Sequence, residues 1–330
     1  MRLGMLGLWH VHAEGMVRQI AVHPGEFLLV GGYDADPALA EHRATRWTNI
    51  LPGFRVFETA AALLAEKLDG VIIEGRVYEN LNLAQQALES GRPVLLEKPA
   101  GDMPGDFERL HEFARARQLH VQMLYLFRSM PAVEELLARA RRGELGEIYQ
   151  FRGRLPKDPA SYAEYVADLG RYRGGMFFEM AGHLVDLLAT LLGKPATITP
   201  FLGHHAGTPG AFTDHGIAMF CYPRAWATIE VSALEAAPRT RRIEVYGTQG
   251  ACIIPHLGSG HLANEAVQVI EVYQNGWPDW QRIERPARPL QIADLREFAA
   301  VVAGKKPPDY SSRHDLLVEQ ILLEASGMAS

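Results

Sequence analysis

The sequence predicts an α/β protein with a doubly wound parallel sheet at the N-terminus and a second, α+β domain built on a largely antiparallel open sheet. Short apolar runs alternate with helical patterns through residues 1–122, which is typical of parallel βαβ units. Between residues 217 and 273, strand-like runs follow one another with only turn residues between them, which is typical of antiparallel strands. The 330 residues exceed what one hydrophobic core normally accommodates, so two domains are expected.

The first domain is expected to cover residues 1–122. Its predicted strands are short and apolar, and segments with helical periodicity separate them. Gly91 stops one of these helices, and Pro93 begins the strand that follows. The strands are expected at 3–8, 27–33, 71–73, 93–97 and 121–126, and the helices at 13–22, 37–45, 60–67, 81–90 and 107–117.

The second domain is expected to cover residues 123–330. Its first helix ends at Gly143, and a loop rich in Arg and Tyr then runs to Arg173. Two C-terminal helices are also predicted, and either could pack back on the first domain. The helices are expected at 131–142, 176–192, 292–302 and 313–327, and the strands at 217–222, 225–232, 242–246, 251–254 and 267–273.

Composition excludes several classes of protein. The formal net charge is −6 and no basic run is longer than two residues, so we expect no nucleic-acid partner. The apolar stretch at the N-terminus is too short for a signal peptide or a membrane span, so we expect no membrane association. Only two cysteines, Cys221 and Cys252, are present, which fits the reducing cytoplasm.

The most informative motif is Glu97-Lys98-Pro99, which directly follows an apolar run. Ligands of open parallel sheets bind beyond the carboxyl ends of the strands, so Lys98 is expected to point into a cofactor crevice. Pro99 fixes its own φ and favours an extended backbone at Lys98, which limits where the ammonium can reach. The alternative is a surface lysine at a strand end.

A nucleotide is expected where the first strand meets its helix. Gly7 occupies the first position of a G-x-G-x-x-G fingerprint, but Trp9 and His12 stand at the other two glycine positions. We therefore predict a dinucleotide site at Gly7, Trp9, His10, Val11 and His12 that keeps the tight turn. The alternative is that Trp9 and His12 pack over the end of the sheet.

Asp34 ends the second predicted strand, 27 residues after Gly7. A carboxylate at this place accepts hydrogen bonds from ribose hydroxyls and repels a 2′-phosphate, which favours NAD over NADP. In the alternative interpretation Asp34 caps the turn that leads into the next helix.

A polar stripe runs along the second predicted helix of the second domain. Glu179, His183 and Asp186 stand at positions i, i+4 and i+7 and so share one helix face. A histidine flanked by carboxylates can accept a proton near neutral pH. The alternatives are a solvated helix face and a histidine bonded within an interdomain contact.

In order and separation, these motifs resemble the glucose–fructose oxidoreductase, inositol dehydrogenase and rhizopine catabolism (Gfo/Idh/MocA) family. Glu97-Lys98-Pro99, Gly174-Gly175 and Glu179-x-x-x-His183-x-x-Asp186 carry the resemblance, which spans nearly the whole chain. The resemblance implies a Rossmann domain and nicotinamide-dependent oxidation or reduction of a sugar, cyclitol or related polyol.

The resemblance also implies residue roles. Lys98 would bind the reacting hydroxyl, stabilise the developing oxyanion and help hold the nicotinamide, together with Glu97 and Pro99. His183 would accept the hydroxyl proton, with Glu179 in the catalytic group. Asp186 would bind substrate hydroxyls or orient His183.

Two further segments depart from the family pattern. Glu179 replaces the usual Asp and is one methylene longer, which can re-aim its carboxylate. Gly75 and Arg76 stand where the family has a Thr-Pro-Asn turn, and Arg76 could contact a cofactor phosphate or an anionic substrate. Arg76 would otherwise be an exposed arginine.

Other polar residues are candidates for lining the site. Tyr125, Arg128 and Tyr162 could bind a polyol, or could serve only in packing. The segment with His204, His205, Asp214 and His215 holds ingredients of a zinc site, alone or with Glu179 and His183, but it has no recognised metal spacing. We therefore expect no metal.

The sequence thus predicts an NAD-dependent oxidoreductase acting on a carbohydrate-like alcohol, with NADP the less favoured cofactor. The alternatives are a non-redox lyase, hydrolase or epimerase on the same scaffold, NAD-assisted or metal-dependent, and an inactive binding protein. An open antiparallel sheet leaves one face to cover, so a homo-oligomer is expected.

Overall fold

The computed structural model describes residues 1–205, 212–236, 241–257 and 267–329. The chain divides into two compact units. Unit 1 comprises Met1–Leu124 and Leu290–Leu316, and unit 2 comprises Tyr125–Pro289 and Leu317–Ser330. The predicted fold class, a parallel doubly wound sheet followed by a largely antiparallel one, is confirmed.

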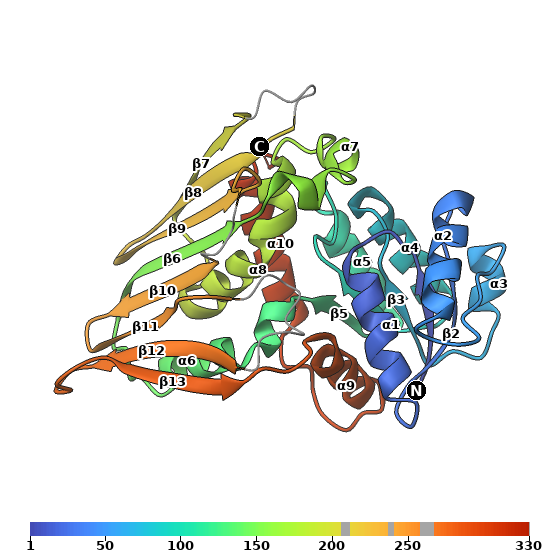
Figure 1. The fold of residues 1–330 in the computed structure, drawn as a ribbon, viewed down its shortest axis with the longest axis horizontal. Helices are drawn as coiled ribbons and strands as arrows, with labels where there is room; N and C mark the ends of the chain where they lie inside the picture. Colours follow the sequence, from blue (N-terminus) through green and yellow to red (C-terminus); the bar gives the residue numbers. More distant parts are fainter. Residues whose placement is uncertain (206–211, 237–240, 258–266, 330) are drawn as a thin grey trace. The chain divides into compact units, whose positions relative to one another are not determined.

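Unit 1 is built on a five-stranded parallel sheet in the order β2-β1-β3-β4-β5. Figure 1 labels β2, β3 and β5 of this sheet. Strands β3, β4 and β5 are buried along their whole length, as expected for apolar runs in a parallel sheet. Strand order reverses between β1 and β3, and ligands of such sheets bind at this switch point, beyond the carboxyl ends of the strands. The strands are β1 Arg2–Leu6, β2 Leu28–Tyr33, β3 Gly70–Ile73, β4 Val94–Glu97 and β5 Val121–Leu124.

The helices of unit 1 bury one apolar face each against this sheet or against a neighbouring helix. Helix α2 begins with a cap in which the Asp36 carboxylate accepts from two backbone N–H groups, followed by Pro37 at the first helical position. Helix α9 places Ile292, Leu295 and Phe298 in the core of unit 1. The helices are α1 His12–Val22, α2 Pro37–Thr48, α3 Ala60–Leu64, α4 Val77–Glu89, α5 Asp106–Ala116 and α9 Gln291–Val302.

Unit 2 is built on an eight-stranded sheet in the order β13-β12-β11-β10-β6-β9-β8-β7. All its neighbouring strands are antiparallel except β6 and β9. The strands are β6 Ile148–Pro156, β7 Thr197–Gly203, β8 His215–Tyr222, β9 Ala225–Ser232, β10 Arg242–Gly247, β11 Gly250–Ile254, β12 Val267–Gln274 and β13 Gln281–Pro286.

Helices α6 and α8 pack on one face of this sheet, α6 against β11 to β13 and α8 against β6, β8 and β9 (Figure 1). Helix α8 is long and apolar enough to cross a membrane by length and composition, but 83% of it is buried inside the protein, as in a core helix. The remaining elements are α6 Pro131–Arg141, α7 Val166–Leu169, α8 Gly175–Leu192, α10 Ser312–Ala325 and the 3₁₀ turns η1 Leu126–Ser129 and η2 Pro159–Tyr162.

Three strands were not predicted from the sequence. The segment expected to be a loop up to Arg173 contains β6, whose apolar residues alternate with Arg and Gln. Strands β7 and β13 lie at the two edges of the sheet, and none of their residues is buried. Edge strands need only one partner and little apolar sequence, so their pattern is weak.

Candidate active site

The turn after β1 touches the turn after β3. Gly7 has φ +76°, and a Cβ atom on it would lie 2.3 Å from the backbone of Gly75. The N–H groups of Trp9 and His10 donate to the Glu74 carbonyl at 3.0 and 2.9 Å. Only glycine allows this approach, so Gly7 keeps the tight turn that the fingerprint requires.

Trp9 lies in this turn with 8% of its surface exposed. The Arg76 guanidinium lies 5.8 Å from the centre of its ring, and Arg43 donates to the carbonyl oxygens of Leu8 and Trp9 at 3.0 and 3.2 Å. The side chain therefore packs where the usual fingerprint has no side chain, while Val11 is exposed at the start of α1.

Asp34 is buried at the end of β2. Its two carboxylate oxygens accept from the N–H groups of Leu8 at 2.7 Å and Asp36 at 2.9 Å. These two hydrogen bonds show that Asp34 caps the turn, as the alternative interpretation expected. Each oxygen can still accept a second hydrogen bond, so binding of the ribose hydroxyls by Asp34 stays a prediction.

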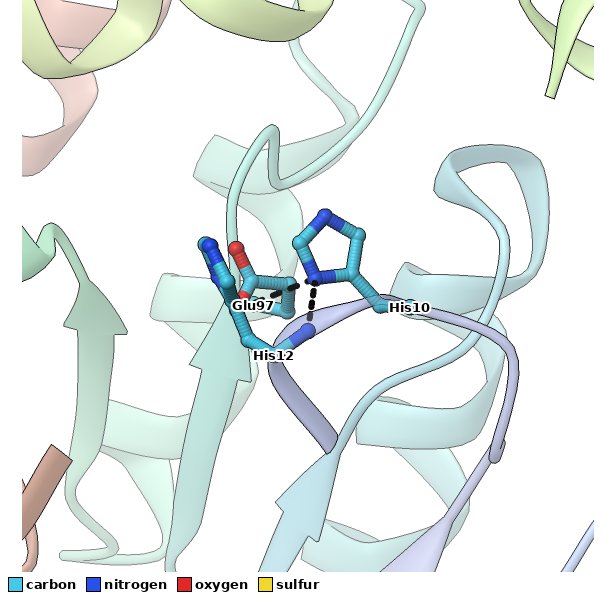
Figure 2. A group of neighbouring side chains, drawn as sticks. All are labelled: His10, His12 and Glu97. Atoms are coloured by element: carbon cyan, nitrogen blue, oxygen red, sulfur yellow. Dashed lines mark hydrogen bonds and ion pairs between the residues drawn. The ribbon is translucent and has the colours of Figure 1, made fainter. Parts of the chain in front are cut away.

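Four side chains meet at the carboxyl ends of β1, β3 and β4: His10, His12, Glu74 and Glu97, here called the histidine–glutamate cluster. Figure 2 shows three of them, His10, His12 and Glu97. His10 Nδ1 lies 3.5 Å from Glu74 Oε2 and 3.6 Å from Glu97 Oε2. His12 Nδ1 lies 3.0 Å from the same Glu97 oxygen. Both glutamates are fully buried, and 20% of the His12 side chain is exposed.

The two glutamates differ in charge state. Burial, reinforced by the charge of Glu97, raises the pKa of Glu74 to about 8. Burial alone would also raise the pKa of Glu97, but His10, His12 and Lys98 outweigh it and hold that pKa below its ordinary value. Near neutral pH, Glu74 therefore carries a proton and Glu97 a negative charge.

Lys98 follows this cluster directly and is 1% exposed, so it is not the surface lysine of the alternative interpretation. Its backbone N–H donates to Glu97 Oε1 at 3.0 Å, and its peptide bond to Pro99 is cis. The positive charge of Lys98 helps to hold the pKa of the buried Glu97 carboxyl below its ordinary value, and buried, charged groups of this kind are typical of functional sites.

The polar stripe on α8 lies in unit 2, and its three members are buried. Gly175 begins the helix with φ +45°, where a Cβ atom would meet the Thr213 carbonyl at 2.5 Å. The His183 ring stacks on Phe127 with centroids 4.5 Å apart and meets the edge of Tyr125 at 6.3 Å. The solvated-face alternative therefore does not hold.

Asp186 forms a bidentate ion pair with Arg128. The guanidinium donates to its two oxygens at 3.0 and 2.6 Å, and lies 4.7 Å from the centre of the Tyr125 ring. Asp186 is fully buried and Arg128 nearly so. The sequence suggested each residue separately, and the structure brings them together through η1.

Glu179 and Tyr162 are both buried in unit 2. Burial, and then the charge of Glu179, raises the pKa of the Tyr162 phenol above its ordinary range. Its hydroxyl donates to the Met180 sulfur at 3.2 Å, and the Lys157 ammonium lies 5.2 Å from the centre of its ring.

The later histidines do not converge as three ligands. His204 Nδ1 lies 3.3 Å from Asp214 Oδ2, and the backbone N–H of His205 donates to the same carboxylate. The His215 ring contacts only the His205 ring of this group, tilted by 59° with centroids 5.4 Å apart. Within the described ranges, the group of three metal-ligating side chains that does converge is His10, His12 and Glu97.

Glu74 was missed by sequence reasoning. It follows the apolar run 71–73 with no spacer, just as Asp34 follows β2 and Glu97 ends β4. The rule that strand ends carry site residues would have found it.

Comparison with known proteins gives the family. The sequence model of the oxidoreductase family with an NAD-binding Rossmann fold matches residues 1–125, and that of the GFO/IDH/MocA C-terminal domain matches residues 133–253. The rhizopine catabolism protein MocA of Rhizobium meliloti is 28% identical over 218 residues, 64% of this chain and 65% of MocA. A dTDP-3,4-didehydro-2,6-dideoxy-alpha-D-glucose 3-reductase of Actinomadura kijaniata is 28% identical over 86% of this chain and 83% of its own.

Two solved structures show the same fold. The UDP-N-acetylglucosamine 3-dehydrogenase GnnA from Acidithiobacillus ferrooxidans superposes with a TM-score of 0.79 at 19% identity, covering 99% of this chain and 97% of its own. The WlbA dehydrogenase from Chromobacterium violaceum, in complex with NADH and UDP-GlcNAcA, gives 0.77 at 18% identity, covering 98% and 92%. The chain belongs to the Gfo/Idh/MocA family of NAD-binding oxidoreductases.

Proposed function

We propose that the protein is an NAD(H)-dependent oxidoreductase that transfers a hydride between the nicotinamide and a secondary alcohol of a sugar, cyclitol or related polyol. The observation that carries the proposal is Lys98, a buried cation at the end of β4 beside the switch point of a parallel sheet. Two relatives named for activity on nucleotide-linked sugars support a carbohydrate substrate.

The residues of unit 1 fit a dinucleotide. The Gly7 turn has no room for a side chain, and the Asp34 carboxylate at the end of β2 suits a ribose diol. Arg76, near the turn, suits a phosphate. The proposed set is Gly7, Trp9, His10, Val11, His12, Asp34, Gly75, Arg76, Glu97, Lys98 and Pro99.

The chain's own residues would manage the proton. When bound, the nicotinamide accepts or supplies the hydride. As the alcohol is oxidised, His183 takes the hydroxyl proton and Lys98 stabilises the negative charge that develops on that oxygen. Arg128 holds the Asp186 carboxylate, which lies on the same face of α8 as His183. Glu179 of α8 and Tyr162 of η2 are the other polar side chains assigned to the site.

The test is turnover with a panel of cyclitols, free sugars and UDP- and dTDP-linked sugars, followed by nicotinamide absorbance. We expect NADH formation with at least one member, and a loss of about 10²- to 10⁴-fold in kcat for Lys98→Met and for His183→Gln. The exposed His42→Ala variant is the matched control and should keep the wild-type rate. Wild-type rates in either active-site variant would remove the mechanism.

We also propose that the protein forms homo-oligomers and works in the reducing cytoplasm. Phe201, Met219 and Trp226 are 63%, 40% and 67% exposed, and their register puts them on the sheet face opposite to α8. An apolar surface of this kind suits a second copy. Light scattering should give a mass above that of one chain, and Trp226→Asp should lower it. Both cysteines are free, which supports the reducing compartment.

A further inference from the structure

We propose that His10, His12 and Glu97, with Glu74 beside them, form a binding site for a divalent transition-metal ion such as Zn²⁺. His10, His12 and Glu97 each offer one ligand atom, and these three atoms all lie within 4.8 Å of one another. Figure 2 shows the three side chains. In a tetrahedral zinc site the ligand atoms lie about 2.0–2.2 Å from the metal and hence about 3.3 Å from one another. The 3.6 and 3.0 Å separations from Glu97 Oε2 to the two imidazoles come close to that spacing.

Glu74 is an independent observation that points to a cation. Its carboxyl group is fully buried, and among the described residues neither oxygen makes a hydrogen bond of ordinary length. One oxygen lies 3.5 Å from His10 Nδ1, so the side chain is aimed into the cluster. Carboxylates buried this deeply are normally hydrogen-bonded, paired or bound to a metal.

The backbone fixes the ligands before any ion binds. Trp9 and His10 donate to the Glu74 carbonyl, and Gly7 and Gly75 bring their two turns into contact. His10 and His12 therefore come from one pinned turn, while the two glutamates come from rigid, buried strand ends. Ligands held in this way lose little conformational entropy on binding.

Charge and chemistry select the class of ion. Two imidazoles and a carboxylate with open positions are typical of catalytic zinc and non-haem iron(II) sites, whereas Mg²⁺ and Ca²⁺ prefer oxygen ligands. Lys98 also faces the cluster and compensates one of the two carboxylates. Coordination of a dication by the other carboxyl group, that of Glu74, would displace its proton and compensate the charge left behind.

Two contacts in the cluster would change on binding. The backbone N–H of His12 donates to His10 Nδ1 at 3.3 Å, which is a long hydrogen bond. Coordination of a metal by His10 Nδ1 would replace it. The metal would also displace the proton that His12 and Glu97 share across 3.0 Å. The half-buried edge of His12 gives solvent, or an oxygen of a bound ligand, access to the remaining positions.

The test uses the full chain, stripped with a chelator and dialysed against Zn²⁺, with no nucleotide or substrate present. We expect one Zn²⁺ per chain, and a visible Co²⁺ absorption spectrum of nitrogen and oxygen coordination. His12→Ala and His10→Ala should each weaken binding at least tenfold. His42→Ala is the control for a lost surface histidine and should bind as the wild type does.

Binding well below one ion per chain would overturn the proposal. So would wild-type affinity in His12→Ala and His10→Ala, because the ion would then sit at other histidines. His12 is partly exposed, so its variant is expected to fold, and circular dichroism checks this. Because neither metal binding nor the Co²⁺ spectrum depends on turnover, failure here and failure of the proposed oxidoreductase activity are separate results.

Discussion

Single residues decide the chemistry, and most of those proposed here are buried ionisable groups. Lys98, Glu97, Glu179, His183 and Asp186 are each at most 7% exposed. Solvation is lost in such places, so each group must find its partner within the protein or its ligand. The sequence pointed to all five because polar residues interrupt otherwise apolar patterns.

What the sequence could not provide is the partner of each residue. Asp186 was expected to meet substrate or His183, and its oxygens instead both accept from Arg128, which is 58 residues away. Glu74 pairs with His10 only because the turns after β1 and β3 touch. Contacts of this kind depend on tertiary packing, which no local pattern records.

The Arg128–Asp186 pair makes a prediction about stability. Asp186→Asn keeps the shape of the side chain but leaves a nearly buried guanidinium without its counter-charge. We expect the free energy of unfolding to fall by about 3–5 kcal/mol, measured by urea denaturation. The matched control is Glu284→Gln, which breaks the exposed pair with Arg282 and should cost at most about 1 kcal/mol. Equal effects of the two variants would contradict the account.

At the scale of elements, strands rich in apolar residues were predicted from the sequence, and strands poor in them were missed. The strands of unit 1 are apolar runs with clear stops, fully buried in β3, β4 and β5, and all five were predicted. In β13 only Ile283 is apolar apart from Pro286, and its register is set by β12 rather than by its own pattern. Pro200 within β7 likewise reads as a break, yet an edge strand tolerates it.

Helix α5 makes the pH-dependent prediction. Its His111 is buried against Phe107, and within the described residues its Nε2 has no hydrogen-bond partner. Burial, with a smaller contribution from His120, lowers the pKa of His111 from 6.5 to about 4. The unfolded chain therefore takes up a proton at this residue before the folded protein does.

Stability should consequently fall as the pH drops from about 6.5 to about 4, by up to about 3 kcal/mol from this residue. His111→Leu should flatten the dependence of the urea midpoint on pH in that window. His42→Ala, which removes an exposed histidine, should leave the slope as it is. An unchanged slope in His111→Leu would show that His111 is not the group responsible.

At the scale of the whole molecule, the two units divide the proposed work. Unit 1 carries the glycine turn, Asp34 and Lys98, and unit 2 carries His183 with its ion pair. The family assignment rests on matches to both parts of the chain. Most departures from the family pattern lie in unit 1, where Trp9, His12 and Arg76 replace residues of the cofactor motifs. Cofactor binding is therefore the part of the account that an experiment tests most severely.

The most direct measurement is a titration of the full chain with NADH and with NADPH, followed by tryptophan fluorescence, because Trp9 lies in the nucleotide turn. The account predicts saturable quenching and energy transfer with NADH, and much weaker binding of NADPH because Asp34 repels a 2′-phosphate. Asp34→Ser removes this negative charge and should bring the affinities for NADH and NADPH closer together. Binding of neither nucleotide would contradict the central claim, and tighter binding of NADPH would contradict the role given to Asp34.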